Sequence, residues 1–204
     1  MKNAYDKFMN DEILPSIRKA LMKEDKLFKK RIESSIHTDF YKDNTKGILS
    51  YILTERTLQY IIFRELCSEF KIFPEDLAYG NSNERLDLSI YKNIKDSTKF
   101  AEIGIELKQV SFTSEGELYQ KSLNNLIADF DKIKRAGNKN KYILLLGVYH
   151  KKTIDIDLFN EFLVTAIDNR KFQKFRLELI SQSYFKTEGY KNKNYFLINL
   201  LRLK

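Results

Sequence analysis

The chain has few of the residues from which disulfide frameworks and zinc clusters are built. It contains one cysteine, Cys67, and two histidines, His37 and His150, among 204 residues. A single cysteine excludes an internal disulfide and a cysteine-based zinc cluster. Two histidines so far apart in the sequence do not indicate a histidine-rich metal site. We expect Cys67 to be a small buried residue on an apolar helix, and the protein to reside in a reducing cytoplasm.

Glycine and proline are also scarce, and long apolar runs are missing. The chain has 7 glycines and 2 prolines, while 43% of its residues are apolar and 31% are charged. This composition predicts a folded protein with long regular elements, and it argues against a disordered chain. No apolar run approaches the roughly 20 residues needed to cross a bilayer, and the opening MKNAYDKFMNDE lacks the apolar core of a signal peptide. We therefore expect no membrane partner.

Positive charge is concentrated toward the end of the chain. The net charge of +8 divides into +3 for residues 1–50, −5 for residues 51–131 and +10 for residues 132–204. A basic final third beside a carboxylate-rich middle is typical of a polyanion-binding surface next to a cation-binding site. An ordinary lysine-rich surface has the same composition. The charge distribution is thus compatible with a nucleic-acid partner and does not require one.

Apolar periodicity predicts helices in the first part of the chain. Residues 1–45 read as one or two helices, with Pro15 near a start or a kink, and we expect them to form an N-terminal helical extension packed on the core. A strong helix is expected from about residue 47 to residue 70, and Pro74 prevents its continuation. The apolar stripe of that helix consists of Ile48, Ile52, Ile62 and Leu66.

The rest of the chain alternates strand-like and helical segments. Residues 86–91 and 100–110 alternate apolar and polar side chains, and the polar loop between them predicts an antiparallel hairpin. A capping box at Ser114 and Glu117 opens a helix that runs to about Arg135. The remaining expected elements are a buried strand at 142–149, a helix at about 157–172, and strands at 175–181 and 195–203. This order predicts an α/β fold for residues 46–204, with a mixed β-sheet flanked by helices.

Charged side chains interrupt the strand expected at residues 100–110. Alternation places Glu106 and Lys108 side by side on one face, opposite an apolar face. If the two strands pair, Asp87 approaches Glu106, and neighbouring carboxylates repel each other unless a divalent cation lies between them. Lys108 would then position a water molecule or neutralise a phosphate. In its own strand, Asp87 is expected to point away from an apolar face formed by Leu86, Leu88 and Ile90.

The segment from Asp87 to Glu106-Leu107-Lys108 resembles the PD-(D/E)xK nuclease superfamily, which has the restriction-endonuclease-like fold. The resemblance covers about residues 46–150, in the order of that superfamily's αβββαβ core. Tyr79 would mark a short first strand, and Leu86 stands where the proline of the family's motif is often found. The segments that carry the resemblance are the helix with Glu55-Arg56, the runs RLDLSIY and IELK, the helix with DFDKI and the apolar strand YILLLGV.

The resemblance implies a reaction and its participants. Asp87 and Glu106 would be metal ligands, Leu107 would contribute its backbone carbonyl, and Lys108 would be the catalytic lysine. The cofactor would be Mg²⁺ or Mn²⁺. The reaction would be hydrolysis of DNA phosphodiester bonds, as in restriction or defence endonucleases. Three E-x-K triplets begin at Glu24, Glu69 and Glu106, and only the last lies in a strand-like run that follows a strand with an aspartate.

Glu55 is an unusual residue for its position on the expected helix. At 100° per residue it lies about 20° from Ile62 and Leu66, near the centre of the apolar stripe. A carboxylate there needs a cleft, a metal or a cation, and Arg85 is one cation that could pair with it. The resemblance implies that a first-helix glutamate joins the metal site. Glu55 is therefore predicted as a further catalytic and metal-binding residue, with an ion pair to Arg85 as the alternative.

Basic residues supply the candidates for phosphate contacts. Arg85 precedes Asp87 and would touch either a phosphate or a carboxylate. Lys132 lies one helical turn after Asp129, so the two residues either form an i,i+3 salt bridge or flank the active site. The further candidates come from the basic final third and are Lys151, Lys152, Lys191 and Lys193.

Taken together, these features predict a metal-dependent endonuclease acting on DNA. The alternative from another class is a nucleic-acid-binding or assembly module with the same fold and no turnover, and RNA is the alternative substrate. The sequence leaves a monomer and a homodimer equally open.

Overall fold

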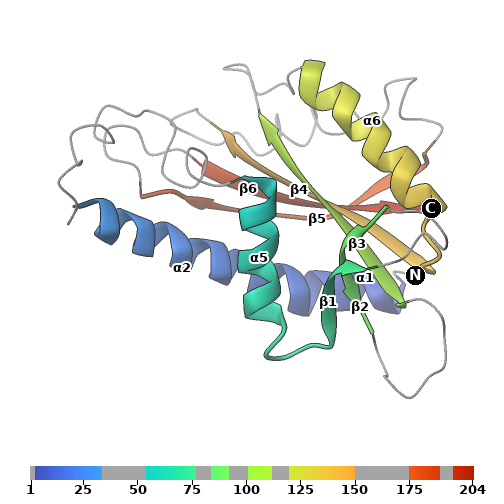
Figure 1. Ribbon diagram of the computed structural model, residues 1–204, viewed down its shortest axis with the longest axis horizontal. Helices are drawn as coiled ribbons and strands as arrows, with labels where there is room; N and C mark the ends of the chain where they lie inside the picture. Colours follow the sequence, from blue (N-terminus) through green and yellow to red (C-terminus); the bar gives the residue numbers. More distant parts are fainter. Residues whose placement is uncertain are drawn as a thin grey trace.

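A six-stranded mixed sheet forms the centre of the computed structural model (Figure 1). The structure describes residues 3–33, 54–76, 84–91, 101–111, 120–149, 175–188 and 195–204. The order of the strands across the sheet is β1-β2-β3-β4-β6-β5. Their bounds are β1 (Ile72–Asp76), β2 (Leu86–Ile90), β3 (Ile103–Ser111), β4 (Asn140–Tyr149), β5 (Leu177–Lys186) and β6 (Tyr195–Leu203).

The strand pairings agree with the expected α/β class. β3 and β4 are parallel, and the other neighbours in the sheet are antiparallel. The predicted hairpin of β2 and β3 is confirmed, and so are the strands predicted at 142–149 and 195–203. The strand predicted at 175–181 begins at Leu177 and continues to Lys186. The observed strand is longer than the predicted one. Its second half has half-buried polar residues and no apolar run, so the sequence pattern did not predict a strand there.

The N-terminal segment is helical, as predicted, and its proline marks an irregularity. Helix α1 (Ala4–Phe8) leads through one π-helical turn, η1 (Met9–Ile13), into the long helix α2 (Leu14–Glu33). The amide of Leu14 donates to the carbonyl of Met9, five residues back, directly before Pro15. A proline has no N–H with which to continue the regular i to i−4 ladder, so the irregular turn adjoins the position where that ladder is interrupted.

The structure has a shorter helix than the one predicted from residue 47 to residue 70. Helix α5 (Glu55–Leu66) begins after Thr54, whose hydroxyl accepts the Thr57 amide, and residues 47–53 lie outside the described parts. Three turn residues follow Leu66, and Cys67 is exposed there, so the prediction of a buried cysteine was wrong. β1 begins at Ile72 and includes Pro74, whereas Tyr79 lies outside the described residues.

The last described helix covers the other side of the sheet. Helix α6 (Gln120–Arg135) ends where the sequence predicted. The capping box at Ser114 and Glu117 and the helix expected at 157–172 lie outside the described residues. None of the described helices is long and apolar enough to span a membrane.

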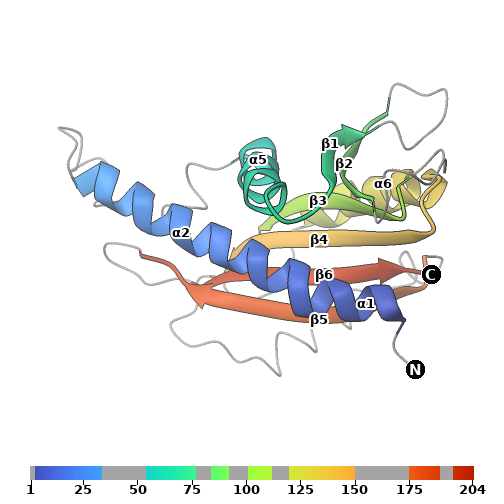
Figure 2. The same cartoon turned by 90° about the horizontal axis from the view of Figure 1, so that it is seen from below.

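Helices pack on both faces of the sheet and divide its core into two clusters. Figure 1 shows α6 and α2 on opposite sides of the strands, and Figure 2 shows α2 running across β4, β6 and β5. The first cluster joins α2 and α5 to one sheet face and includes Ile17, Leu21, Ile62, Ile105 and Leu144. The second cluster joins α6 to the other face and includes Phe130, Ile133, Ile143, Leu145 and Leu201.

Strand β2 departs from the predicted single apolar face. Leu88 and Ile90 belong to the cluster under α2 and α5, as alternation requires, but Leu86 packs in the cluster under α6. The register of β1 against β2 is even, with Pro74 beside Leu88 and Asp76 beside Leu86, but Glu75 between them has a positive φ of 53°. This left-handed residue departs from strand geometry at the end of β1 that faces Leu86, and the alternation along β2 does not extend to that end.

Candidate active site

The candidate site lies where β2 leaves the edge of β3. The two strands pair only from Leu88 to Ile90 against Ile103 to Ile105, whereas β3 pairs with β4 along its whole length. Beyond Ile105, two backbone amides on the β2 side of β3 donate to side-chain carboxylates. This half-open edge brings the predicted residues of α5, β2, β3 and α6 together.

Asp87 is held against the backbone of β3. Its Oδ2 accepts the Leu107 amide at 2.7 Å, and Gln59 on α5 donates to the Asp87 carbonyl, also at 2.7 Å. Burial raises the pKa of Asp87 to about 6. The Leu107 amide and Lys132 act against that shift, and the charges of Glu55 and Glu75 add to it. The predicted approach of Asp87 to the Glu106 strand is therefore present.

Glu106 is the most deeply buried acid of the site. Its side chain is 5% exposed, and its Oε1 is paired with Nζ of Lys132. No hydrogen-bond partner among the described residues reaches its Oε2. Burial raises the pKa of Glu106 to about 8, with a further contribution from the charge of Asp87, and Lys132 offsets part of the effect. One buried oxygen of the site is thus left without a partner.

Lys108 lies two residues further along β3, on the same face as Glu106. Its Nζ is 3.0 Å from Oδ2 of Asp129 on α6 and 3.4 Å from Oε2 of Glu55 on α5. Burial works against the charged ammonium, but the two carboxylates outweigh it and raise the pKa of Lys108 above its usual value. Lys108 is therefore a cation held between two acids.

Glu55 occupies the first position of α5 and faces the sheet edge. Its Oε2 accepts the amide of Gln109 at 3.0 Å as well as contacting Lys108. Its helix buries Ile62 and Leu66, the residues with which Glu55 shares a stripe, while the Glu55 side chain itself is 39% exposed. The alternative prediction, an ion pair between Glu55 and Arg85, was wrong. Glu55 makes its ion pair with Lys108, and Arg85 is exposed.

Asp129 and Lys132 of α6 complete the cluster. The sequence left open whether they pair with each other or flank the site. The ion pair of Asp129 is made with Lys108 and that of Lys132 with Glu106, so both point to β3. Burial raises the pKa of Asp129, and the contact with Lys108 acts in the opposite direction. Lys132, predicted as a phosphate contact, is here the partner of Glu106.

Two residues of the cluster were not predicted. Gln59 donates to Oε1 of Glu75 at 3.0 Å in addition to the Asp87 carbonyl. Gln59 follows Glu55 by four residues and so lies on the same helix face, a signal that was available in the sequence. Glu75 reaches the site through a left-handed backbone conformation, which no local sequence pattern predicted.

Of the other predicted nucleic-acid contacts, the structure describes Arg85 only. Arg85 is exposed at the start of β2, near the site but without a role that its surroundings define. The other four candidates lie outside the described residues: Lys151, Lys152, Lys191 and Lys193.

The carboxylates of the cluster meet some of the requirements of a magnesium site. In the described parts of the chain, no group of three or more Asp, Glu, His and Cys side chains has the arrangement of a metal site. Mg²⁺, however, is commonly bound by one or two carboxylates, with water completing its shell. The repulsion between Asp87 and Glu106 and the orphaned Glu106 Oε2 are what a cation between them would relieve.

The chain matches no family model, and neither a curated protein nor a solved structure is significantly similar to it.

Proposed function

We propose that the protein is a metal-dependent nuclease that hydrolyses phosphodiester bonds of DNA, of the kind found in restriction or defence systems. The observation that carries the proposal is the contact of Asp87 Oδ2 with the Leu107 amide. It holds the aspartate of β2 against Glu106-Leu107-Lys108, the segment whose motif resembles the PD-(D/E)xK nucleases. The restriction-endonuclease-like core belongs to the same proposal, supported by the mixed sheet and the helices on both its faces.

Four groups would hold the cation in this proposal. Asp87 and Glu106 would supply carboxylates, and Glu55 would supply a third through a bridging water. The Leu107 amide points to the open edge, and because the N–H and C=O of one strand residue point to the same side, its carbonyl is available there. A bound Mg²⁺ or Mn²⁺ would lower the pKa of a coordinated water and stabilise negative charge on the phosphate.

The protein's own residues have separate tasks in this scheme. Lys108 is charged and held between Asp129 and Glu55, so it can position water or neutralise a phosphate oxygen. Lys132 occupies Glu106 Oε1 and leaves Oε2 for the cation. Substrate phosphate, brought in with its own negative charge, offers Lys132 an alternative partner.

One observation favours the alternative of a binding or assembly module without turnover. The carboxylates and the lysines of the cluster already neutralise one another: Lys132 pairs with Glu106, and Lys108 pairs with Asp129 and Glu55. A cluster of this kind can be purely structural, since buried charges are commonly paired. The two functions differ in whether a metal binds at all.

The deciding experiment is a cleavage assay with purified protein. Plasmid, linear duplex, single-stranded DNA and RNA are incubated with Mg²⁺ or Mn²⁺, and with EDTA as the blank. We expect metal-dependent cleavage of DNA, and a loss of at least about a hundredfold in Asp87→Ala, Glu106→Ala and Lys108→Ala. Glu102→Ala, a glutamate four residues before Glu106, is the matched control and should cleave normally.

Two results would refute the proposal. Cleavage at near wild-type rate in all three variants would disprove the site assignment. Absence of cleavage by the wild type, together with no heat of Mg²⁺ or Mn²⁺ binding by calorimetry, would favour the binding module.

A further inference from the structure

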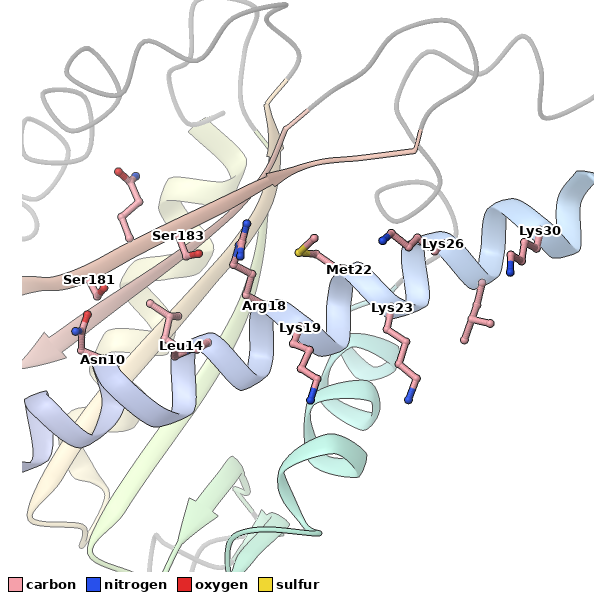
Figure 3. A pocket seen from close by; sticks show the side chains of 13 residues that line it. Asn10, Leu14, Arg18, Lys19, Met22, Lys23, Lys26, Lys30, Ser181 and Ser183 are labelled. Atoms are coloured by element: carbon pink, nitrogen blue, oxygen red, sulfur yellow. The ribbon is translucent and has the colours of Figure 1, made fainter.

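A basic groove separates α2 from β5, the edge strand of the sheet (Figure 3). Its volume is about 760 Å³. Figure 3 shows Arg18, Met22 and Lys26 on the side of α2 that approaches β5, with Ser181 and Ser183 on the strand opposite. The cations that line the groove all come from α2 and are Arg18, Lys19, Lys23, Lys26 and Lys30.

The exposed face of this helix segment has charge of a single sign. The two acids among residues 18–31, Glu24 and Asp25, are both buried. Glu24 is paired with Arg64 of α5, and Asp25 accepts the amide of Glu188. Both carboxylates face inward to partners of their own, and the helix lysine whose charge acts on Asp25 is Lys29, which does not line the groove. The lysines of the groove are therefore not neutralised by i,i+4 pairs with these two acids.

Three lysines of the groove have no ion-pair partner among the described residues. In the part of the chain that the structure describes, Lys23, Lys26 and Lys30 are exposed and make no salt bridge. Lys19 has only a distant carboxylate, with its Nζ 4.0 Å from Oε1 of Glu65. Uncompensated positive charge of this density attracts a polyanion.

The spacing along α2 fits a phosphate backbone. From Arg18 to Lys30 the helix rises about 18 Å at about 1.5 Å per residue. That length corresponds to about five successive phosphates of one strand at about 3.4 Å of axial rise each. Lys19 and Lys23, like Lys26 and Lys30, are four residues apart and so follow one another along the helix. The cations thus form a row and not a point site.

The opposite wall supplies neutral hydrogen-bonding groups. A β-bulge between Leu179 and Ser181 interrupts the pairing of β5 with β6, and bulges redirect the side chains that follow. Ser181 and Ser183 line the groove beyond it. Serine hydroxyls are common donors to phosphate oxygens in protein–DNA contacts. Arg18 Nε donates a hydrogen bond to the Tyr184 carbonyl at 3.1 Å, which links α2 to β5.

We propose that the groove between α2 and β5 binds the phosphate backbone of a nucleic acid. The choice of nucleic acid over another polyanion rests on the proposed nuclease function, and the groove would add a contact to DNA away from the cluster at Glu106. An anionic membrane is the less suitable partner. Of the apolar side chains on the lining, Leu14 is buried, Met22 is half-buried and Leu27 is exposed. A planar bilayer could reach Leu27 but not the buried floor at Leu14, whereas a strand of nucleic acid is narrow enough to follow the groove.

Binding measured in EDTA tests the groove without any catalysis. The full-length protein is titrated into a fluorescently labelled random-sequence duplex, and anisotropy is recorded at KCl concentrations between about 50 and 200 mM. The test variant is Lys23→Gln/Lys26→Gln/Lys30→Gln. The control variant, Lys7→Gln/Lys71→Gln/Lys139→Gln, removes the same charge from exposed lysines elsewhere.

We expect the groove variant to bind at least about tenfold more weakly at low salt. Its plot of log K against log salt should be flatter by about 0.9 for each lysine that contacts a phosphate. The control should keep the wild-type slope. Equal weakening in both variants, or wild-type binding by the groove variant, would refute the inference. So would a groove variant that loses binding to phosphatidylserine vesicles while it keeps its affinity for DNA.

The two proposals fail in different ways. Wild-type protein that binds DNA through the groove in EDTA but never cleaves would refute the nuclease function and leave the groove standing. Metal-dependent cleavage, with unchanged DNA binding in the groove variant, would do the reverse.

Discussion

Glu106 is the residue at which stability and function conflict most clearly. It projects from a core strand, and burial raises its pKa from an ordinary 4.5 to about 8. Between these two values the folded protein keeps a proton that the unfolded chain has already released. The free energy of unfolding therefore falls as the pH rises through this window, and the loss is complete above about pH 8.

Replacing Glu106 by Gln should remove that loss. Gln keeps the shape and cannot ionise, so we expect Glu106→Gln to be more stable than the wild type at pH 9, by several kcal/mol at most. At pH 4 the two proteins should be nearly equal. Urea unfolding at both pH values in EDTA measures the difference, and Glu102→Gln, directly before the same strand, serves as the control. A stability difference that does not change with pH would show that Glu106 is ionised in the fold without cost.

Glu55 offers a test of the metal site that is separate from stability. It is 39% exposed and accepts the Gln109 amide, and Gln retains an oxygen that can accept the same bond. We expect Glu55→Gln to raise the Mg²⁺ concentration needed for half-maximal cleavage several-fold, with little change in melting temperature.

The control for Glu55 is Glu65→Gln, on the same helix and outside the cluster. A metal titration beside a melting curve separates the two roles of Glu55. A lower melting temperature with an unchanged metal requirement would assign Glu55 a structural role only.

At the scale of elements, β3 positions most of the site. Its alternation directs Ile103, Ile105 and Leu107 into one apolar cluster and presents Glu106 and Lys108 to α6. The strand is parallel to β4 along its whole length but pairs with β2 over three residues only. The half that β2 leaves is the half that carries the charged residues, so the edge is open where the chemistry is proposed.

Gly104 allows β3 to approach its neighbours closely at the paired end. A Cβ at this position would lie 2.7 Å from Cδ2 of Leu86 and 2.8 Å from Cγ of Asn138. Asn138 is buried and donates to the Ala101 carbonyl, so it cannot move freely. We expect Gly104→Ala to lower the free energy of unfolding by about 1–3 kcal/mol through overpacking, as measured by urea unfolding.

Ser89 is the matched control for Gly104, because it is the register partner of Gly104 on β2. Its buried Oγ has no hydrogen-bond partner among the described residues, so Ser89→Ala should be neutral or stabilising. If Gly104→Ala proves neutral as well, the packing around β2 and β3 is looser than these distances require.

At the scale of the whole molecule, the N-terminal helices and the sheet share one core. Residues of α2 and α5 lie in the same apolar cluster as β3 and β4. Near the N-terminus, the buried Asp6 accepts the hydroxyl of Tyr142 at 2.8 Å and pairs with Arg202 of β6. Burial and this hydrogen bond to Asp6 raise the pKa of Tyr142 far above its usual value. Sequence positions at both ends of the chain thus meet at one polar contact.

Removing the Asp6 carboxylate should destabilise the entire protein. Asp6→Ala leaves Arg202 with Glu178 alone, and breaking a buried ion pair from one side costs about 3–5 kcal/mol. We expect a single unfolding transition, displaced to lower urea, in both far-ultraviolet circular dichroism and tyrosine fluorescence. The exposed Asp11→Ala is the control. Two separate transitions would instead identify residues 1–45 as an independent unit.

The local pattern of the sequence was sufficient for most elements. Strict alternation around Glu106 and Lys108 predicted β3, because successive side chains of a strand point to opposite faces. The continuous apolar run from residue 142 to 149 predicted β4, because a strand buried on both faces carries apolar residues throughout. The ends of α5 and the position of β1 were not predicted correctly. There, turn residues and an irregular backbone at Glu75 decide the structure, and neither produces a periodic signal.

The sequence by itself determined that Glu106 and Lys108 would stand opposite an apolar face of their strand, since that depends only on neighbours along the chain. Only the tertiary structure decided what each of them touches. The pairing of Lys108 with Asp129 and Glu55, and of Lys132 with Glu106, joins residues from three elements. The row of lysines on α2 became a groove only when β5, more than 150 positions later, packed beside it. Such contacts depend on how helices and strands pack, which residue periodicity does not encode.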